Sequence, residues 1–239
     1  NNVLAHVPDI RDFVKGFHPL LKPLGVATFE FPHVVNLISS VLFDTIYHEH
    51  FSYLSLTFVN RLMKEIGLEI FDVEKLSTHG GSLRVFVCKT GAHIITENVT
   101  IVQTEEDALN LSNPRGYIGM ASNVQKILSD FKIFLKQAAT DGKVVAGYGA
   151  AAKGNTFLNV AGVDATAIKF VVDRNPSKQN TLLPGVHIPV LSPDEIINRR
   201  PDYLVILPWN IAAEVEEQQA YIRDWGGKFV TAIPTLKIQ

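Results

Sequence analysis

Residues 143–173, KVVAGYGAAAKGNTFLNVAGVDATAIKFVVD, decide the fold of the C-terminal part of the chain. They predict an apolar strand, a glycine-rich turn, a helix and a second apolar strand that ends at Asp173. Further helices are expected at residues 192–199 and 212–225, and further strands at residues 202–209 and 228–234. Because strands alternate with helices and each strand is continuously apolar, we expect a parallel sheet covered on both faces.

The N-terminal part of the chain shows a different order of elements. Helices are expected at residues 10–22 and 56–66, and strands at residues 25–32, 68–76 and 82–89. This order is typical of the second half of an open α/β domain. Between the two parts, residues 93–102 (HIITENVTIV) predict at most one strand and residues 117–137 predict a long amphipathic helix.

Composition excludes several classes of function. The chain has 239 residues, 46% hydrophobic and 19% charged, with a net charge of -2 and no long run of Lys or Arg, so neither a nucleic acid nor a membrane surface is an expected partner. No apolar run reaches the roughly 18 residues of a membrane span. Cys88 is the only cysteine, so no intramolecular disulfide is possible and we expect a cytoplasmic protein. The N-terminus has neither an initiator Met nor the features of a signal peptide, and we expect the chain to begin within a domain.

The stretch Tyr47-His48-Glu49-His50 groups four titratable side chains. A phenol, a carboxylate and two imidazoles can exchange protons near neutral pH, as chemistry beside a carbonyl group requires. In a helix Tyr47 and His50 would share one face, whereas in a strand His48 and His50 would share one. Solvated polar side chains at a helix start are the alternative interpretation.

A second motif, residues 147–152 (GYGAAA), joins a strand to a helix in the pattern G-x-G-x-x-A. In the dinucleotide fingerprint such glycines let the backbone approach a pyrophosphate, and the acid after the next strand, here Asp173, meets a ribose hydroxyl. A tight turn without a ligand is the alternative. Lys153, Arg174 and Lys178 add positive charge that would suit a diphosphate.

Six stretches together resemble the motif series of the sugar C-methyltransferases. They are FDTIYHEHFSYLSL, THGGSLRVFV, GYGAAAKGNTFLN, VVDRNPSKQ, LPGVHIPV and ILPWN, in this order along nearly the whole chain. Enzymes of that family use S-adenosylmethionine to methylate C3 of a nucleotide-linked 4-keto-deoxysugar. They have an N-terminal cysteine-rich zinc module, a central methyltransferase domain with a glycine-rich loop of its own, and a C-terminal Rossmann-like domain.

The resemblance implies an α/β fold, with a partial class I methyltransferase-like sheet followed by a Rossmann-like parallel sheet. Residues 1–90 would be the C-terminal half of the methyltransferase domain, residues 91–140 a linker and long helix, and residues 141–239 the Rossmann-like C-terminal domain. The zinc cysteines and the first glycine loop are not found in the chain. We therefore expect zinc only in a module outside it, an incomplete site for S-adenosylmethionine, and the N-terminal portion of the same enzyme as its protein partner.

The resemblance also assigns roles to single residues. His50 would be the base that removes the C3 proton, with Tyr47 and His6 at the ketone or enolate oxygen, Glu49 orienting His50 or a sugar hydroxyl, and His48 structural. Asn2 would contact the methyl donor. The nucleotide-linked sugar would be bound by Gly147, Gly149, Lys153, Asn155, Arg174, Lys178 and His79.

Two other classes of function remain open. The Gly147–Gly149 turn could serve an NAD(P)-dependent oxidoreductase or a nucleotide-binding module. Binding of nicotinamide cofactors would identify the oxidoreductase. His48 and His50 could belong to a metal-binding module, although the sequence lacks H-E-x-x-H and has no obvious further ligand set.

Overall fold

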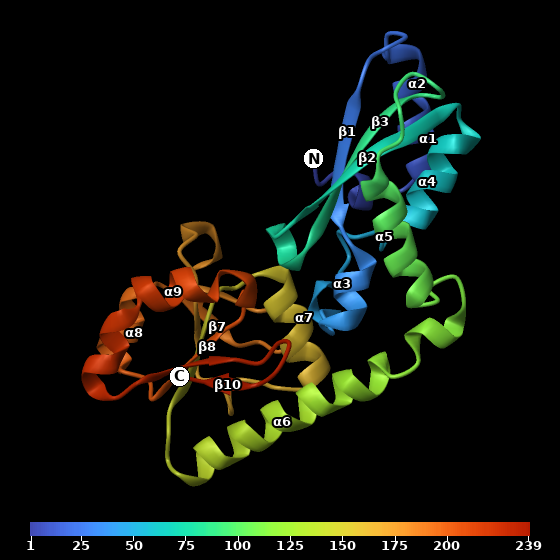
Figure 1. The fold of residues 1–239 in the computed structure, drawn as a ribbon. Coiled ribbons are helices and arrows are strands. Elements are labelled where there is room, and N and C mark those ends of the chain that lie inside the picture. Colours follow the sequence, from blue (N-terminus) through green and yellow to red (C-terminus); the bar gives the residue numbers. More distant parts are fainter. The chain divides into compact units, whose positions relative to one another are not determined.

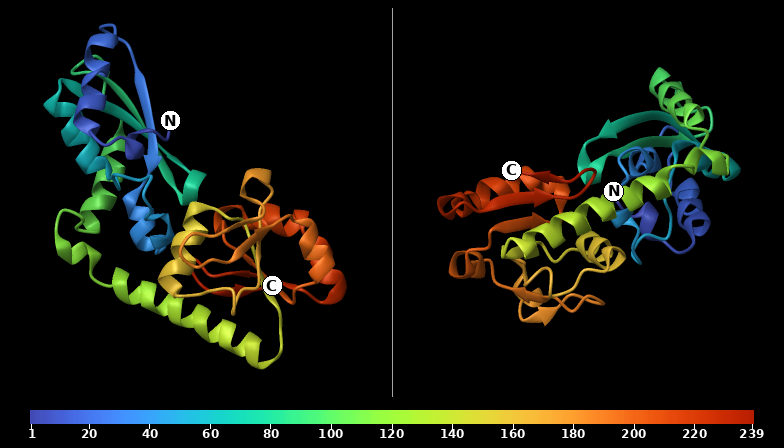
Figure 2. Two further views of the ribbon diagram at one scale, coloured as in Figure 1. Left: turned by 180° about the vertical axis from the view of Figure 1, so that it is seen from behind. Right: turned by 90° about the horizontal axis from the view of Figure 1, so that it is seen from below.

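Two units make up the chain in the structure, a computed structural model that describes residues 1–239 with the exception of the side chain of His79. The first unit comprises Asn1–Ser40 and His48–Met120, and the second comprises Val41–Tyr47 and Ala121–Gln239. Figure 1 labels their helices and strands, and Figure 2 shows two further views. No helix in the described part of the chain is long and apolar enough to cross a membrane.

The sheet of the first unit has three strands. They are β1 (Ala27–Pro32), β2 (Leu68–Leu76) and β3 (Ser82–Lys89), in the order β1-β3-β2. The central strand β3 is antiparallel to both neighbours, so β1 and β2 run in the same direction. A bulge between Ile70 and Asp72 shifts the alternation of β2, so that Val73 joins the core.

Helices cover one face of this sheet. The helices of the first unit are α1 (Ile10–Lys15), α2 (Phe17–Leu20), α3 (Val34–Ser39), α4 (Leu56–Glu65) and α5 (Glu97–Ala108), with 3-10 helices at Leu4–His6, Thr78–Gly80 and Pro114–Tyr117. Alternate residues of β3, such as Leu83 and Val85, pack with Val14 of α1 and Leu62 of α4 in one buried cluster. The predicted helix at residues 10–22 is present as α1 and α2, which meet at Gly16.

The expectation of a linker with at most one strand at residues 93–102 is wrong, because this part of the chain forms a helix. Most of this stretch lies in α5, which begins at Glu97. The polar composition of this stretch obscured its period, but Val99, Val102 and Glu106 recur at helical spacing and are buried together on one side of α5. Burial of this face against the first unit decides the local structure.

The second unit contains a seven-stranded sheet. Its strands are β4 (Val145–Tyr148), β5 (Val171–Val172), β6 (Thr181–Leu182), β7 (Pro189–Leu191), β8 (Tyr203–Ile206), β9 (Lys228–Thr231) and β10 (Lys237–Ile238), in the order β10-β9-β8-β4-β5-β7-β6. The five inner strands are parallel and the outer pairs β6–β7 and β9–β10 are antiparallel. The expected α/β fold is confirmed, but the sequence pattern predicted neither the inner strand β7 nor the edge strands β6 and β10.

Both faces of this sheet are covered by helices. They are α6 (Met120–Thr140), α7 (Ala152–Ala161), α8 (Asp194–Arg199) and α9 (Ala212–Gln218), with 3-10 helices at Phe43–Thr45, Pro176–Lys178, Trp209–Ile211 and Ala220–Trp225. Ile196 of α8 and Val215 of α9 pack with Ala146 of β4 in one cluster. On α6 and α7, the rings of Phe131 and Phe157 lie 4.8 Å apart. The sheet thus has the two covered faces that its continuously apolar strands require.

Candidate active site

The stretch from Tyr47 to His50 is irregular backbone, so it has neither the helical nor the strand geometry considered above. Tyr47 is the last residue of a segment of the second unit, and His48 begins a segment of the first. Tyr47 and His50 are partly buried, whereas His48 and Glu49 are exposed. Contacts with other segments, rather than periodicity, therefore determine the surroundings of each side chain.

His50 lies beside His6 in the first unit. The centroids of the two imidazole rings are 4.8 Å apart, and the ring planes are inclined at 61°. The ring of Tyr53 is 6.0 Å from that of His50, in an edge-on arrangement. The structure therefore brings together the two histidines to which the resemblance assigns the base and an oxygen contact.

One hydrogen bond determines the proton arrangement of His6. Its Nδ1 is 2.8 Å from the backbone carbonyl oxygen of Glu49, and because a carbonyl only accepts, Nδ1 carries a proton. Nε2 of a neutral His6 is then an acceptor, and it can donate only when the ring is doubly protonated. The backbone N–H of Phe51 donates to the carbonyl of Ala5 at 2.8 Å and joins the same two segments. The main chain of the turn that bears His50 thus orients His6.

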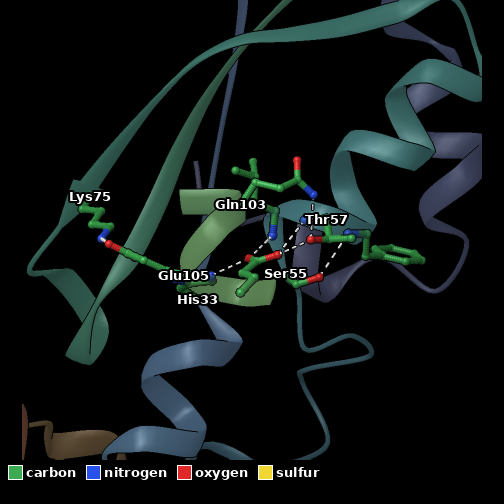
Figure 3. Close-up of polar contacts among 9 residues, drawn as sticks. His33, Ser55, Thr57, Lys75, Gln103 and Glu105 are labelled. Atoms are coloured by element: carbon green, nitrogen blue, oxygen red, sulfur yellow. Dashed lines mark hydrogen bonds and ion pairs between the residues drawn. The ribbon is translucent and has the colours of Figure 1, made fainter. Parts of the chain in front are cut away.

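The sequence did not indicate a buried contact between a histidine and a carboxylate that lies within the first unit; Figure 3 labels the histidine, His33, and the neighbouring Thr57. His33 Nε2 is 2.7 Å from Oε1 of Glu106, and the two side chains are only 3% and 2% exposed. The carboxylate also accepts hydrogen bonds from the backbone N–H of Leu56 at 2.5 Å and from the N–H and hydroxyl of Thr57 at 2.8 and 2.6 Å. Glu106 therefore supplies a negative charge at the N-terminus of α4, where free N–H groups and the helix dipole favour it.

These bonds explain the ionisation of Glu106 and its structural effect. Burial alone would raise the pKa of Glu106, but the hydrogen bonds from His33, Thr57 and Leu56 outweigh it and hold the pKa below its ordinary value. The backbone N–H of Val34 donates to the carbonyl of Leu54 at 3.0 Å. The loop that contains His50 is therefore fixed at its far end, directly before α4.

Internal packing explains the glycines of the turn between β4 and α7. A Cβ atom at Gly147 would lie 2.9 Å from a methyl group of β5, and one at Gly149, where φ is +91°, would lie 2.6 Å from Cδ of Pro208. Asp173 accepts a hydrogen bond from the backbone N–H of Ala150 at 2.8 Å. In the dinucleotide fingerprint, the Asp173 carboxylate and the backbone N–H of Ala150 would both face a ligand. Here they are bonded to each other, which favours the interpretation as a tight turn without a ligand.

The other residues expected to bind the sugar nucleotide follow the carboxyl ends of β4 and β5, except for His79, whose side chain lies outside the described part. Their contacts within the chain are from Lys153 Nζ to Asn210 at 2.8 Å, from Asn159 to Asn155 Oδ1 at 3.3 Å, from Arg174 to Gln218 at 3.3 Å and from Lys178 Nζ to the carbonyl of Ala150 at 2.8 Å. Parallel sheets bind ligands at the carboxyl ends of their strands, where these residues lie. That they bind the sugar nucleotide stays a prediction.

Asp44 is a buried acid that sequence analysis missed, although it lies within the stretch FDTIYHEH. Its Oδ2 accepts a hydrogen bond from the indole N–H of Trp209 at 2.7 Å. Burial raises the pKa of Asp44 to about 6, against the opposing effects of Trp209 and of the nearby Lys153 ammonium. Burial also lowers the pKa of Lys153, while Asp44 raises it. All three residues belong to the second unit.

Comparison with known proteins identifies the family. Residues 77–234 match the family model described as the C-methyltransferase C-terminal domain. The chain belongs to this C-methyltransferase family. A curated relative, C-methyltransferase NovU of Streptomyces niveus, is 35% identical over 235 residues, which cover 98% of this chain and 56% of the relative. The chain thus spans little more than half the length of that relative.

The expectation that this C-methyltransferase chain holds an incomplete site for S-adenosylmethionine stays a prediction. Among the residues that the structure describes, the G-x-G turn between a strand and a helix is that of β4 and α7, and Pro208 closes it. Asn2, expected at the methyl donor, has a φ of 56°, and its backbone N–H donates to the carbonyl of Glu30 at 2.9 Å. One polar residue in this position can be only a small part of a site for so large a ligand.

Proposed function

We propose that this chain is part of an enzyme that methylates C3 of a nucleotide-linked 4-keto-deoxysugar, with a thymidine diphosphate sugar as the first candidate and S-adenosylmethionine as the methyl donor. The observation that supports this most is the pairing of His6 and His50 at 4.8 Å in a C-methyltransferase chain. Two adjacent imidazoles can offer a proton acceptor and a proton donor to one substrate. Portions of the enzyme outside this chain complete the site for the methyl donor.

The residues of the chain account for the enolisation of the sugar. The 4-ketone acidifies the hydrogen on C3, because the charge left by its removal moves to the ketone oxygen. Neutral His50 accepts this proton. The hydroxyl of Tyr47, and Nε2 of His6 in its doubly protonated form, donate hydrogen bonds to the enolate oxygen. Glu49 has an exposed side chain that is available to a sugar hydroxyl, and His48 takes no part.

In the same proposal, the nucleotide contacts the second unit. Arg174 is exposed and Lys178 is partly exposed, and both follow the carboxyl end of β5. Their charges suit a diphosphate. Contacts there hold the sugar nucleotide equally before and during enolisation, so they contribute to binding more than to turnover.

The position of the transferred methyl group tests this proposal. The full-length enzyme is incubated with a thymidine diphosphate 4-keto-deoxysugar and S-adenosylmethionine that carries a 13C-methyl group. We expect carbon NMR of the product to show the label bonded to C3. A label on oxygen, on nitrogen or on another carbon, or an unreacted sugar, would contradict the proposed function.

A further inference from the structure

The segment Val41–Tyr47 packs at the carboxyl ends of β4 and β8 in the second unit. Phe43 lies 6.1 Å from Phe157 of α7, measured between ring centroids. Asp44 is bonded to Trp209, which begins the 3-10 helix directly after β8. Both contacts are within the second unit, although the segment is far from the rest of that unit in the sequence.

This place is the topological switch point of the sheet. From β4 the chain continues to β5 on one side, whereas β8 lies on the other side of β4. Open α/β sheets bind their ligands in the crevice at such a point, outside the carboxyl ends of the strands. Here the residues that follow β4 and β8 bind a carboxylate of the chain itself.

The Asp44 carboxylate has an unusual environment. The residue is 1% exposed, and in the part of the chain that the structure describes its Oδ1 has no hydrogen-bond partner. The ammonium group of Lys153 lies 4.7 Å from the centroid of the Trp209 ring, and donates to Asn210 at 2.8 Å. A buried carboxylate with one unsatisfied oxygen is costly, and such departures from good packing are concentrated at functional sites.

Local hydrogen bonds connect Asp44 to the candidate active site. The backbone N–H of Ile46 donates to the carbonyl of Phe43 at 3.0 Å, and the hydroxyl of Thr45 donates to the carbonyl of Leu42 at 2.7 Å. The segment is therefore closed on itself between Leu42 and Ile46. Tyr47, the proposed donor to the enolate oxygen, is the next residue.

We infer that Asp44 is a positioning residue, which through Trp209 and Lys153 anchors Val41–Tyr47 at the switch point and so fixes the place of Tyr47. This inference rests on the proposed function. Within the second unit, Asp44 and its partners would then determine how Tyr47, the proposed donor to the enolate oxygen, is held.

A double-mutant cycle in the full-length enzyme tests the positioning role. Asn at position 44 can still accept from Trp209 but has no charge to face Lys153. We expect Asp44→Asn to lower kcat on the order of tenfold to a hundredfold, as displaced catalytic groups do, with little change in KM. We expect no further loss when Asp44→Asn is added to Tyr47→Phe, because both act at the same hydrogen bond.

Asp202→Asn is the matched control. Asp202 pairs with Lys143 at 2.8 Å and precedes β8, so it lies at the opposite end of the same strands. We expect this variant to lose stability and to keep its kcat. Equal losses of kcat in Asp44→Asn and Asp202→Asn, or independent effects of Asp44→Asn and Tyr47→Phe, would overturn the positioning role. A wild-type enzyme that does not react with the keto sugar would instead overturn the proposed function.

Indole NMR tests the anchor itself without reference to catalysis. The chain has two tryptophans, and the indole N–H of Trp225 donates to the backbone carbonyl of Pro201 at 3.0 Å, which does not titrate. With resonances assigned by Trp209→Phe and Trp225→Phe, we expect the Trp209 signal of the full-length enzyme to shift with pH, with a midpoint of about 6, and the Trp225 signal to stay constant. The Asp44→Asn variant should abolish the shift. A Trp209 signal that does not respond to pH in the wild-type enzyme would show that the Asp44 carboxylate is not its partner and overturn the inference.

Discussion

At the scale of single residues, the protonation of His6 is the main constraint on the proposed chemistry. Its Nδ1 proton is held by the carbonyl of Glu49, so only Nε2 is left for a substrate. A neutral His6 would present a lone pair to the enolate oxygen, which is repulsive, whereas a doubly protonated His6 would donate to it. Enolisation therefore requires His50 to be neutral while His6 is charged.

Tyr47→Phe tests the second donor to the enolate oxygen. Removing one such hydrogen bond costs roughly 2.7 to 4 kcal/mol, by analogy with a donor of an oxyanion hole, or about a hundred- to a thousandfold in rate. We expect kcat of the full-length enzyme to fall by this factor. Tyr53→Phe is the control and should have a smaller effect on kcat. The ring of Tyr53 is 6.0 Å from that of His50. An unchanged kcat in Tyr47→Phe would exclude Tyr47 from the oxygen site.

Sequence reasoning reached some of these residues and not others, for physical reasons. His50 could be proposed from the sequence because it belongs to a run of four titratable side chains. His6 could be found only through the resemblance, since one histidine after an apolar run has no signature of its own. His33 and Glu106 are 73 positions apart and meet only in the folded chain. No local pattern reports such a pair.

At the scale of elements, α4 and α5 depend on the buried charge of Glu106. Its carboxylate holds the N-terminus of α4 and the side chain of His33 at once. Because its pKa is lowered in the folded state, Glu106 contributes stability above its ordinary pKa of 4.5, and this contribution is lost as the pH falls through the folded value. The first unit should therefore be sensitive to acid below about pH 4.5.

Glu106→Gln tests this role of the carboxylate. A hydrogen bond to a charged group contributes about 1.5 to 3 kcal/mol, and the neutral amide of Gln would weaken those that the Glu106 carboxylate accepts. We expect a loss of this size in the free energy of unfolding at neutral pH, and a weaker dependence on pH below about 4.5. Denaturant unfolding of the full-length enzyme at several pH values measures both.

The neighbouring residue provides a matched control for this variant. Glu105 pairs with Lys75 on the surface, and their side chains are 44% and 52% exposed. Such pairs contribute at most about 1 kcal/mol, so Glu105→Gln should have little effect. Figure 3 shows the Lys75–Glu105 pair apart from the contacts around His33 and Thr57. Similar effects of Glu105→Gln and Glu106→Gln would contradict the importance of the buried pair.

At the element scale, periodicity identified the fold better than residue type did. The three strands of the first sheet and β4, β5, β8 and β9 of the second followed from apolar runs, and α4 from its spacing of buried residues. The error at residues 93–102 arose because the sequence showed no sustained period there, whereas burial of Val99 and Val102 on one side of α5 decided the structure. The short edge strands β6 and β10 are exposed and have only two residues each, so they left no apolar pattern to detect.

At the scale of the whole molecule, neither unit is one continuous stretch of the sequence. The chain passes from one unit to the other after Ser40, after Tyr47 and after Met120. Val41–Tyr47 therefore belongs to the sheet of the second unit, although its neighbours in the sequence belong to the first. This arrangement could not be predicted from local sequence, because it depends on contacts such as Asp44 with Trp209, which are 165 positions apart.

Ligand-dependent thermal stability distinguishes the possible roles of the second unit. Since packing closes the turn at Gly149 and Asp173 is bonded to Ala150, NADH and NADPH should leave the melting temperature of the full-length enzyme unchanged. A thymidine diphosphate sugar should raise it, because a ligand that binds only the folded state stabilises that state. Arg174→Ala should weaken the second effect. A saturable shift with NADH alone would favour an oxidoreductase.

The most direct test of the central claim, that His50 is the base, is hydrogen exchange at C3 of the 4-keto sugar in heavy water, measured by proton NMR with the full-length enzyme and no methyl donor. Enolisation precedes methylation, so the wild-type enzyme should replace the C3 hydrogen with deuterium. His50→Asn should abolish the exchange, and His48→Asn, the exposed histidine of the same turn, should leave it nearly unchanged. Near-normal exchange in His50→Asn, with loss of exchange in His48→Asn, would contradict the account.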